Sequence, residues 1–291
     1  MIERILVPTD GSELSERAIP LATVLASAQG AQVFLAQAVS PPAWMAMDDG
    51  GYGSYGAINP ELYQQLLDEM DAEARENLDR LASSFQATPG VGQVQTQLFH
   101  GSPHAALLDY EQEIRADLVV LATHGRTGLA RFALGSVADR MVREGAAPVL
   151  MVRSFGREVT AVDRALVPLD GSSLSERSLP MVEALAGKPL HGVTLLTVAD
   201  GEDEDARMYL DTAAVRLRAS GLTVDARVLA GDAGEVIAAA ADEAGLIIMA
   251  THGRSSFDRV RHGSIAEQVL HDSPVPLLLV RAREDEPDSP A

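Results

Sequence analysis

Three segments of the first half of the chain return, in the same order, in the second half. They are RILVPTDGSELSER at 4–17 with RALVPLDGSSLSER at 164–177, DLVVLATHGR at 117–126 with GLIIMATHGR at 245–254, and PVLMVR at 148–153 with PLLLVR at 276–281. A repeated order of matched segments indicates duplication of one structural unit. Each half must therefore fold in the same way, and whatever site one half builds should have a counterpart in the other.

The length of 291 residues agrees with this reading, since it predicts about two domains. We expect a first domain at 1–153, a linker at 154–162, a second domain at 163–283 and a disordered acidic tail at 284–291. The first copy is longer mainly because of residues 40–60, which are rich in Gly, Pro, Tyr and Met and lack periodicity. We expect a long loop there. A lid over the site, a subunit contact and a mobile excursion remain open as its role.

Composition narrows the class of protein. Hydrophobic residues make up 46% of the chain, enough for a sizeable core, and there is no cysteine to form disulfides or thiolate metal sites. The formal net charge of −19 repels phosphate backbones and anionic membrane surfaces, so neither nucleic acid nor membrane is an expected partner. No apolar run approaches the ~20 residues that span a bilayer. We expect a cytoplasmic protein.

In each copy, short apolar runs alternate with segments of helical periodicity. Such alternation predicts an α/β fold with two tandem, open, doubly wound parallel sheets of five strands each. The expected strands are 2–8, 32–38, 93–99, 117–122 and 148–152, then 165–169, 193–199, 224–230, 245–250 and 276–280. The expected helices include 13–29, 61–85, 103–115, 136–144 and 203–219.

A Pro-x-Asp-Gly-Ser motif follows the first strand of each copy. In open α/β sheets ligands bind at the carboxyl ends of strands, where the strand order reverses. An Asp there suits a ribose hydroxyl or a bound Mg²⁺, but it also suits a simple Asp-Gly turn, and both interpretations stay open. The motif residues are Pro8, Thr9, Asp10, Gly11 and Ser12, then Pro168, Leu169, Asp170, Gly171 and Ser172.

A second motif follows the fourth strand of each copy. Ala-Thr-His-Gly is separated by nine residues from Gly-Ser, at Gly125 and Gly135 in the first copy. The Gly-Ser pair opens a helix, whose N–H groups and dipole favour an anion such as phosphate. The alternative is that Ser136 and Ser264 only start their helices, in capping boxes with Asp139 and Glu267.

With these motifs the chain resembles the tandem universal stress proteins of the nucleotide-binding type. The signature of that family is Gly-x₂-Gly-x₉-Gly-(Ser/Thr) together with an Asp after the first strand. The resemblance covers nearly the whole chain in both copies. It implies a parallel sheet in the order 3-2-1-4-5 in each copy. It also implies that the last strands of the copies pair antiparallel, giving a pseudo-twofold monomer, two of which can form a homodimer.

The resemblance also implies which residues lie at each nucleotide. The Pro-x-Asp segment lies beside the adenosine, and a residue of the second strand contacts adenine. The residues around the signature bind the rest of the nucleotide, including its phosphates. Carried over by motif position, these are Pro8, Thr9, Asp10, Ala38, Leu121, Ala122, Gly125, Arg126, Gly135, Ser136 and Val137 in the first copy. In the second copy they are Pro168, Leu169, Asp170, Val198, Met249, Ala250, Gly253, Arg254, Gly263, Ser264 and Ile265.

Both copies depart from the signature at its first glycine, which is Ala122 or Ala250 here. The methyl group affects how closely a ligand approaches, so the departure concerns affinity and not fold. The second copy also places Arg259, Arg261 and His262 ahead of Gly263. These side chains either bind phosphate or line a solvated face.

The expected function is that of a nucleotide-binding stress-response or regulatory protein, not an enzyme. The ligand would be ATP, or ADP or AMP, with Mg²⁺ where phosphates are bound. A regulatory partner of unknown identity would respond to the nucleotide-bound state of the protein. A slow ATPase is one alternative, although no G-x-x-x-x-G-K-[ST] loop exists and Lys188 is the only lysine. An interaction module with vestigial nucleotide sites is the other.

Overall fold

The computed structural model describes residues 1–40, 60–123, 134–153, 159–201, 203–252 and 265–282. Most of the expected loop at 40–60, part of the expected linker at 154–162 and the expected tail at 284–291 lie outside these residues.

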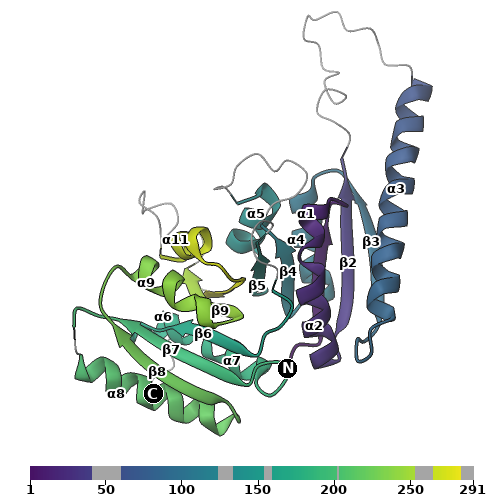
Figure 1. Ribbon diagram of the computed structural model, residues 1–291. Coiled ribbons are helices and arrows are strands. Elements are labelled where there is room, and N and C mark those ends of the chain that lie inside the picture. Colours follow the sequence, from purple (N-terminus) through teal and green to yellow (C-terminus); the bar gives the residue numbers. More distant parts are fainter. Residues whose placement is uncertain (41–59, 124–133, 154–158, 202, 253–264, 283–291) are drawn as a thin grey trace, which may run out of the picture.

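Ten strands form one sheet, in the order β3-β2-β1-β4-β5-β10-β9-β6-β7-β8 (Figure 1). Each half has the predicted order 3-2-1-4-5, with all neighbours inside a half parallel. The strands of the first half are β1 (Arg4–Thr9), β2 (Gln32–Val39), β3 (Val94–His100), β4 (Leu118–Ala122) and β5 (Val149–Val152). Those of the second half are β6 (Arg164–Pro168), β7 (Gly192–Val198), β8 (Thr223–Leu229), β9 (Leu246–His252) and β10 (Leu277–Ala282).

The two halves meet where β5 pairs antiparallel with β10, as the resemblance implied. Leu150 lies opposite Leu278 in this pairing, and both side chains are buried. Apolar edge strands are prone to pair with another chain, and pairing them with each other removes that hazard. The expectation of two sheets is therefore refined, because the halves share one continuous sheet.

Two arginines bind across this junction in a reciprocal manner. Arg281 at the end of β10 donates from Nη1 to the carbonyl oxygen of Gly145, at 2.9 Å. Arg153, directly after β5, donates in the same way to the carbonyl oxygen of Ser273. Each arginine thus holds the loop that precedes the last strand of the other half, which repeats the pseudo-twofold relation at the level of side chains.

Helices cover both faces of the sheet, and each face has a core that runs through both halves. One core packs under α2, α3, α7 and α8, and the other under α4, α5, α9 and α11. The helices of the first half are α1 (Glu13–Glu16), α2 (Ile19–Gln29), α3 (Pro60–Gln86), α4 (Pro103–Ile114) and α5 (Ser136–Glu144). Those of the second half are α6 (Ser173–Glu176), α7 (Leu179–Leu185), α8 (Glu204–Ala219), α9 (Ala233–Ala240) and α11 (Ile265–Asp272), with a 3₁₀ turn at Ala241–Glu243.

The single helix expected at 13–29 is wrong, because the chain breaks it into α1 and α2. Pro20 occupies the first turn of α2, and Pro180 does the same in α7. Proline has no N–H with which to continue the preceding turn, but it is well tolerated where a helix begins. The same break in both halves leaves α1 and α6 as one-turn helices directly after the first strands.

Candidate functional site

The motif after β1 folds into a turn organised by Asp10. Its Oδ1 accepts hydrogen bonds from the backbone N–H of Ser12 at 3.0 Å and from the Ser12 hydroxyl at 2.6 Å. The Ser12 hydroxyl in turn accepts the N–H of Ser15 at 3.2 Å and caps α1. The predicted Asp-Gly turn therefore exists, with Gly11 in the left-handed region at φ 77°. Asp10 serves the turn whether or not it also meets a ligand.

The second half repeats this turn. Asp170 Oδ1 accepts from the N–H of Ser172 at 3.0 Å and from its hydroxyl at 2.5 Å, and Ser172 caps α6. Partial burial of Asp170 alone would raise its pKa. The hydrogen bonds from Ser172, with smaller ones from Ser175 and the backbone, outweigh that burial and lower the pKa of Asp170 below its ordinary value. The carboxylate is therefore held in its charged form.

The helix after β4 begins without a side-chain cap. Gly135 is the N-cap of α5, its N–H donates to the carbonyl oxygen of Thr123 at 2.8 Å, and Ser136 is exposed at the first helical position. The capping box expected between Ser136 and Asp139 does not form, because Gly135 is the N-cap and Ser136 is already the first helical residue. Asp139 instead pairs with Arg143 at 2.7 Å. Within the described part of the chain, no side chain accepts a hydrogen bond from the first N–H groups of α5, which have no partner inside the helix. They lie at the end of β4, the strand next to β1.

The other expected residues that the structure describes lie at the same edge of the sheet. Ala38 and Ala122 are half-buried near the ends of β2 and β4, and Leu121 is buried. Val198, Met249 and Ala250 occupy the matching places in β7 and β9, and Ile265 opens α11. The structure thus gathers β1, β2 and β4, or their copies, around one edge in each half. Six expected residues lie outside the described ones: Gly125, Arg126, Gly253, Arg254, Gly263 and Ser264.

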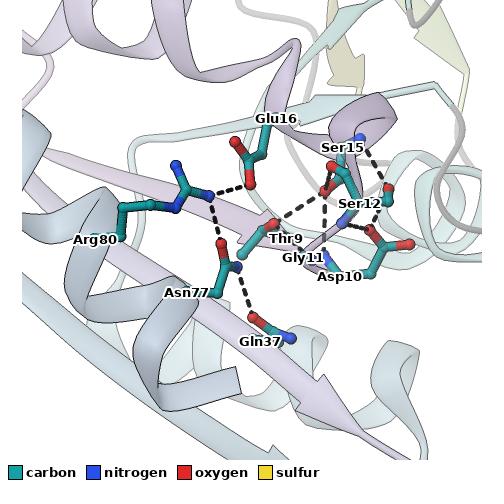
Figure 2. Close-up of polar contacts among 9 residues, drawn as sticks. All are labelled: Thr9, Asp10, Gly11, Ser12, Ser15, Glu16, Gln37, Asn77 and Arg80. Atoms are coloured by element: carbon teal, nitrogen blue, oxygen red, sulfur yellow. Dashed lines mark hydrogen bonds and ion pairs between the residues drawn. The ribbon is translucent and has the colours of Figure 1, made fainter. Parts of the chain in front are cut away.

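A chain of polar contacts beside the β1 turn was not anticipated from the sequence (Figure 2). Gln37 of β2 accepts at Oε1 from Asn77 Nδ2 of α3, at 3.0 Å. Asn77 Oδ1 accepts from Arg80 Nη2 at 2.6 Å, and Arg80 also pairs with Glu16 of α1. The one signal in the sequence is a glutamine within the otherwise apolar run VFLAQAV, at the register of Thr9.

The second half has different residues in the corresponding places. Leu169 stands in place of Thr9 and Thr197 in place of Gln37, with the Thr197 hydroxyl donating to the carbonyl oxygen of Leu169 at 2.8 Å. Tyr209 of α8 lies near Glu176, the counterpart of Glu16. Burial, together with the charge of Glu176, raises the pKa of Tyr209 to about 12. The backbone turn is therefore shared between halves, but its polar surroundings are not.

Within the described residues, no three His, Asp or Glu side chains gather in a way that could hold a metal ion. Among the same residues, no helix has the length and apolar character to cross a membrane.

Comparison with known proteins identifies relatives along the entire chain. The model of the Universal stress protein family matches residues 1–153 and 161–281. A universal stress protein of Synechocystis sp. is 29% identical over 297 residues, spanning 96% of this chain and 100% of that protein. A universal stress protein of Methanocaldococcus jannaschii is 31% identical over 158 residues, spanning 54% of this chain and 86% of that protein.

Solved structures agree on the fold. The crystal structure of a universal stress protein from Archaeoglobus fulgidus superposes with a TM-score of 0.73 at 22% identity, covering 96% of this chain and 98% of that one. The duplicated motifs, the strand order of each half and the match to the family model in both halves lead to one conclusion: the chain belongs to the universal stress protein family, with two family domains in tandem.

Proposed function

We propose that the chain is a nucleotide-binding regulatory protein of the stress response, with one adenine nucleotide site in each half. The observation that carries the proposal is the N-terminus of α5. Its N-cap is Gly135, which has no side chain, and no other side chain among the described residues caps it; it lies at the carboxyl end of β4 beside the β1 turn. Orphan N–H groups and the helix dipole suit a phosphate group.

The remaining parts of each site follow from the strand ends. The ribose would lie near Asp10 or Asp170, whose carboxylates the turn already fixes in place. Adenine would lie against Ala38 and Leu121, or against Val198 and Met249. Gly125, Arg126, Gly253, Arg254, Gly263 and Ser264 complete the two proposed sites by their position in the motifs.

Magnesium belongs to the proposal only together with the nucleotide. A net charge of −19 disfavours the approach of ATP, and Mg²⁺ bound to the phosphates reduces that repulsion. When bound, the ion would neutralise phosphate charge, while Asp10 or Asp170 supplies an oxygen of the kind that Mg²⁺ accepts. A cytoplasmic location, pairing of two chains and a partner protein that responds to the nucleotide are the finer parts of the same proposal.

Calorimetric titration with Mg-ATP tests the proposal. Gly135 has φ −60°, so Gly135→Ala adds a methyl group at the site without backbone strain. We expect weaker binding to the first half and a slightly lower melting temperature, because alanine is a poorer N-cap than glycine. Ser102→Ala is the matched control, because Ser102 is the N-cap of α4 and makes no cap hydrogen bond there. Absence of Mg-ATP binding to the wild-type chain would overturn the proposal and leave an interaction module.

A further inference from the structure

A hollow lies at the amino edge of the first-half sheet, opposite to the edge of the proposed nucleotide site. It has a volume of about 580 Å³ and lies between the start of β1 and the turn that joins α4 to β4. Its charged and amide-bearing lining residues are Arg4, Glu111, Gln112, Arg115 and Asp117. Hollows of this size hold small molecules in many proteins, and two of these side chains are permanently cationic.

The two carboxylates of the lining bind the protein backbone. Glu111 is 2% exposed, and its Oε1 accepts from two consecutive N–H groups of the loop before β5. Asp117 Oδ2 accepts from the N–H groups of Glu3 and Arg4, both at 2.9 Å. Backbone N–H dipoles compensate part of each negative charge. The acids therefore shape the walls of the hollow and hold the start of β1 against β4.

The two arginines have unpaired donors. Arg4 Nε is buried without a hydrogen-bond partner, since Oδ2 of Asp117 lies 3.9 Å away, beyond hydrogen-bond reach. Arg115 is exposed, and no carboxylate pairs with it within the described part of the chain. A guanidinium offers five N–H groups in a planar fork that matches a carboxylate or a phosphate group. The hollow thus has donors available for an oxyanion.

The backbone of Arg115 adopts a conformation that favours glycine. Its φ is 50°, and it is the one non-glycine residue with a positive φ among those that the structure describes. The left-handed conformation costs stability for an arginine but not for a glycine. Backbone strain of this kind concentrates at functional sites, and here the strained residue lines the hollow.

We propose that this hollow is an oxyanion site, in which Arg4 and Arg115 bind a small molecule through its phosphate or carboxylate group. The amide of Gln112 donates a further hydrogen bond. Short-range hydrogen bonds outweigh the net charge of −19, because salt screens the repulsion from distant carboxylates. The site is separate from the nucleotide sites, since it lies at the other edge of the sheet.

The second half has not kept these residues. Glu243 stands where the repeat places Arg115, and it pairs with Arg227 at 3.1 Å. Gly245 stands in place of Asp117, and a Cβ there would lie 2.6 Å from a backbone carbonyl oxygen of the segment before β6. That segment fills the space into which the side chain of Asp117 extends in the first half. The proposed oxyanion site therefore belongs to the first half, with one ligand per chain.

Titration of the full chain with inorganic phosphate, and separately with succinate, tests the site at constant ionic strength. Backbone amide resonances in two-dimensional NMR spectra report where each anion binds. We expect saturable shifts at residues 112–117, distinct from any shifts at the N-terminus of α5. Binding of phosphate alone would identify a phosphate group as the ligand, and binding of succinate alone would identify a carboxylate.

Three variants separate binding from stability. Arg115→Gly removes one guanidinium and relieves the backbone, so the melting temperature should rise while the dissociation constant increases about 10-fold, the size of one charge-assisted hydrogen bond. Asp117→Asn keeps an acceptor for the two N–H groups and removes the negative charge beside Arg4, so the anion should bind more tightly. Arg75→Gln removes an exposed charge on α3 as the matched control and should leave the affinity within about twofold.

Two results would overturn the inference. Unchanged resonances at 112–117 in the wild-type chain with both anions would show that the hollow binds no oxyanion. Equal affinities of the wild-type chain and Arg115→Gly would show that the anion is held by general charge and not by this guanidinium. Neither result bears on the nucleotide sites, which the Mg-ATP titration tests separately.

Discussion

Individual side chains stabilise the turns of this protein and account for the differences between its two halves. The aspartates and serines after β1 and β6 are readable from the sequence, since Asp-Gly-Ser is a turn and cap pattern. The Gln37–Asn77 pair is not readable in that way. Its members are 40 residues apart, and only the packing of α3 on β2 brings them together. A polar residue in an apolar strand indicates that its side chain has a polar partner, but the sequence does not show which residue that partner is.

Ser172→Ala should lower the free energy of unfolding by about 1 kcal/mol, because it removes the cap of α6. It also removes the hydrogen bonds that lower the pKa of Asp170. A lowered folded-state pKa stabilises the protein above the unfolded pKa, about 3.9, and that stabilisation is lost as the pH falls through the folded value. The difference between wild type and variant should therefore be largest near neutral pH and shrink below about pH 4. Urea titrations from acidic to neutral pH measure it; a pH-independent difference would contradict the account.

Tyr209 should ionise at a pKa of about 12, well above the ordinary phenol value of 10.0. The tyrosinate absorbance difference between the wild-type chain and Tyr209→Phe isolates this group. Glu176→Gln removes the neighbouring charge and should lower the pKa of Tyr209 toward its ordinary value. A Tyr209 that titrates near that ordinary value in the native protein would show that burial and Glu176 do not act on it as described.

Helices and strands were largely predictable from periodicity, and their ends less so. The strands of both halves were expected within a few residues, and the long helix α3 (Pro60–Gln86) was expected at 61–85. The break between α1 and α2 was missed because apolar spacing continues through it, whereas Pro20 decides where the second helix starts. Helix ends depend on single backbone conformations, which a hydrophobic pattern does not encode.

At two helix ends we predict opposite changes in stability, one from removing a glycine and the other from introducing one. Gly30 ends α2 at φ 69°, and a Cβ there would meet only the Gly90 carbonyl oxygen at 3.9 Å. Gly30→Ala should therefore cost about 1 kcal/mol through backbone strain and not through crowding. Arg115 ends α4 at φ 50°, so Arg115→Gly should stabilise by about 0.5 kcal/mol. Chemical denaturation of both variants checks the signs, and equal signs would refute the argument.

The two halves form one structural unit and not two separate domains joined by a linker. Both cores run through the two halves and the sheet is continuous. Arg153 and Arg281 each bind the loop that precedes the last strand of the other half. The duplication was evident from the sequence and the family resemblance implied how the last strands pair. The reciprocal arginines could not be foreseen, because their partners are backbone carbonyl oxygens.

Leu278→Ala should destabilise the entire chain by about 2–5 kcal/mol, since it opens a cavity at the junction. We expect a single thermal transition at lower temperature, with coincident curves from far-ultraviolet circular dichroism and calorimetry. Ile265→Ala, at an exposed position, serves as the control and should shift the transition little. Two transitions, of which only one moves, would mean that the halves unfold independently.

We propose that both halves hold an adenine nucleotide, and nucleotide content tests this proposal most directly. The freshly purified chain is saturated with Mg-ATP, freed of excess ligand and denatured, and the released nucleotide is quantified by chromatography and mass spectrometry. We predict about two adenine nucleotides per chain, about one for Val137→Glu or Ile265→Glu, and about none for the double variant, with ligand-induced melting shifts in step. No released nucleotide from the wild-type chain, together with an unchanged melting temperature in Mg-ATP, would contradict the claim.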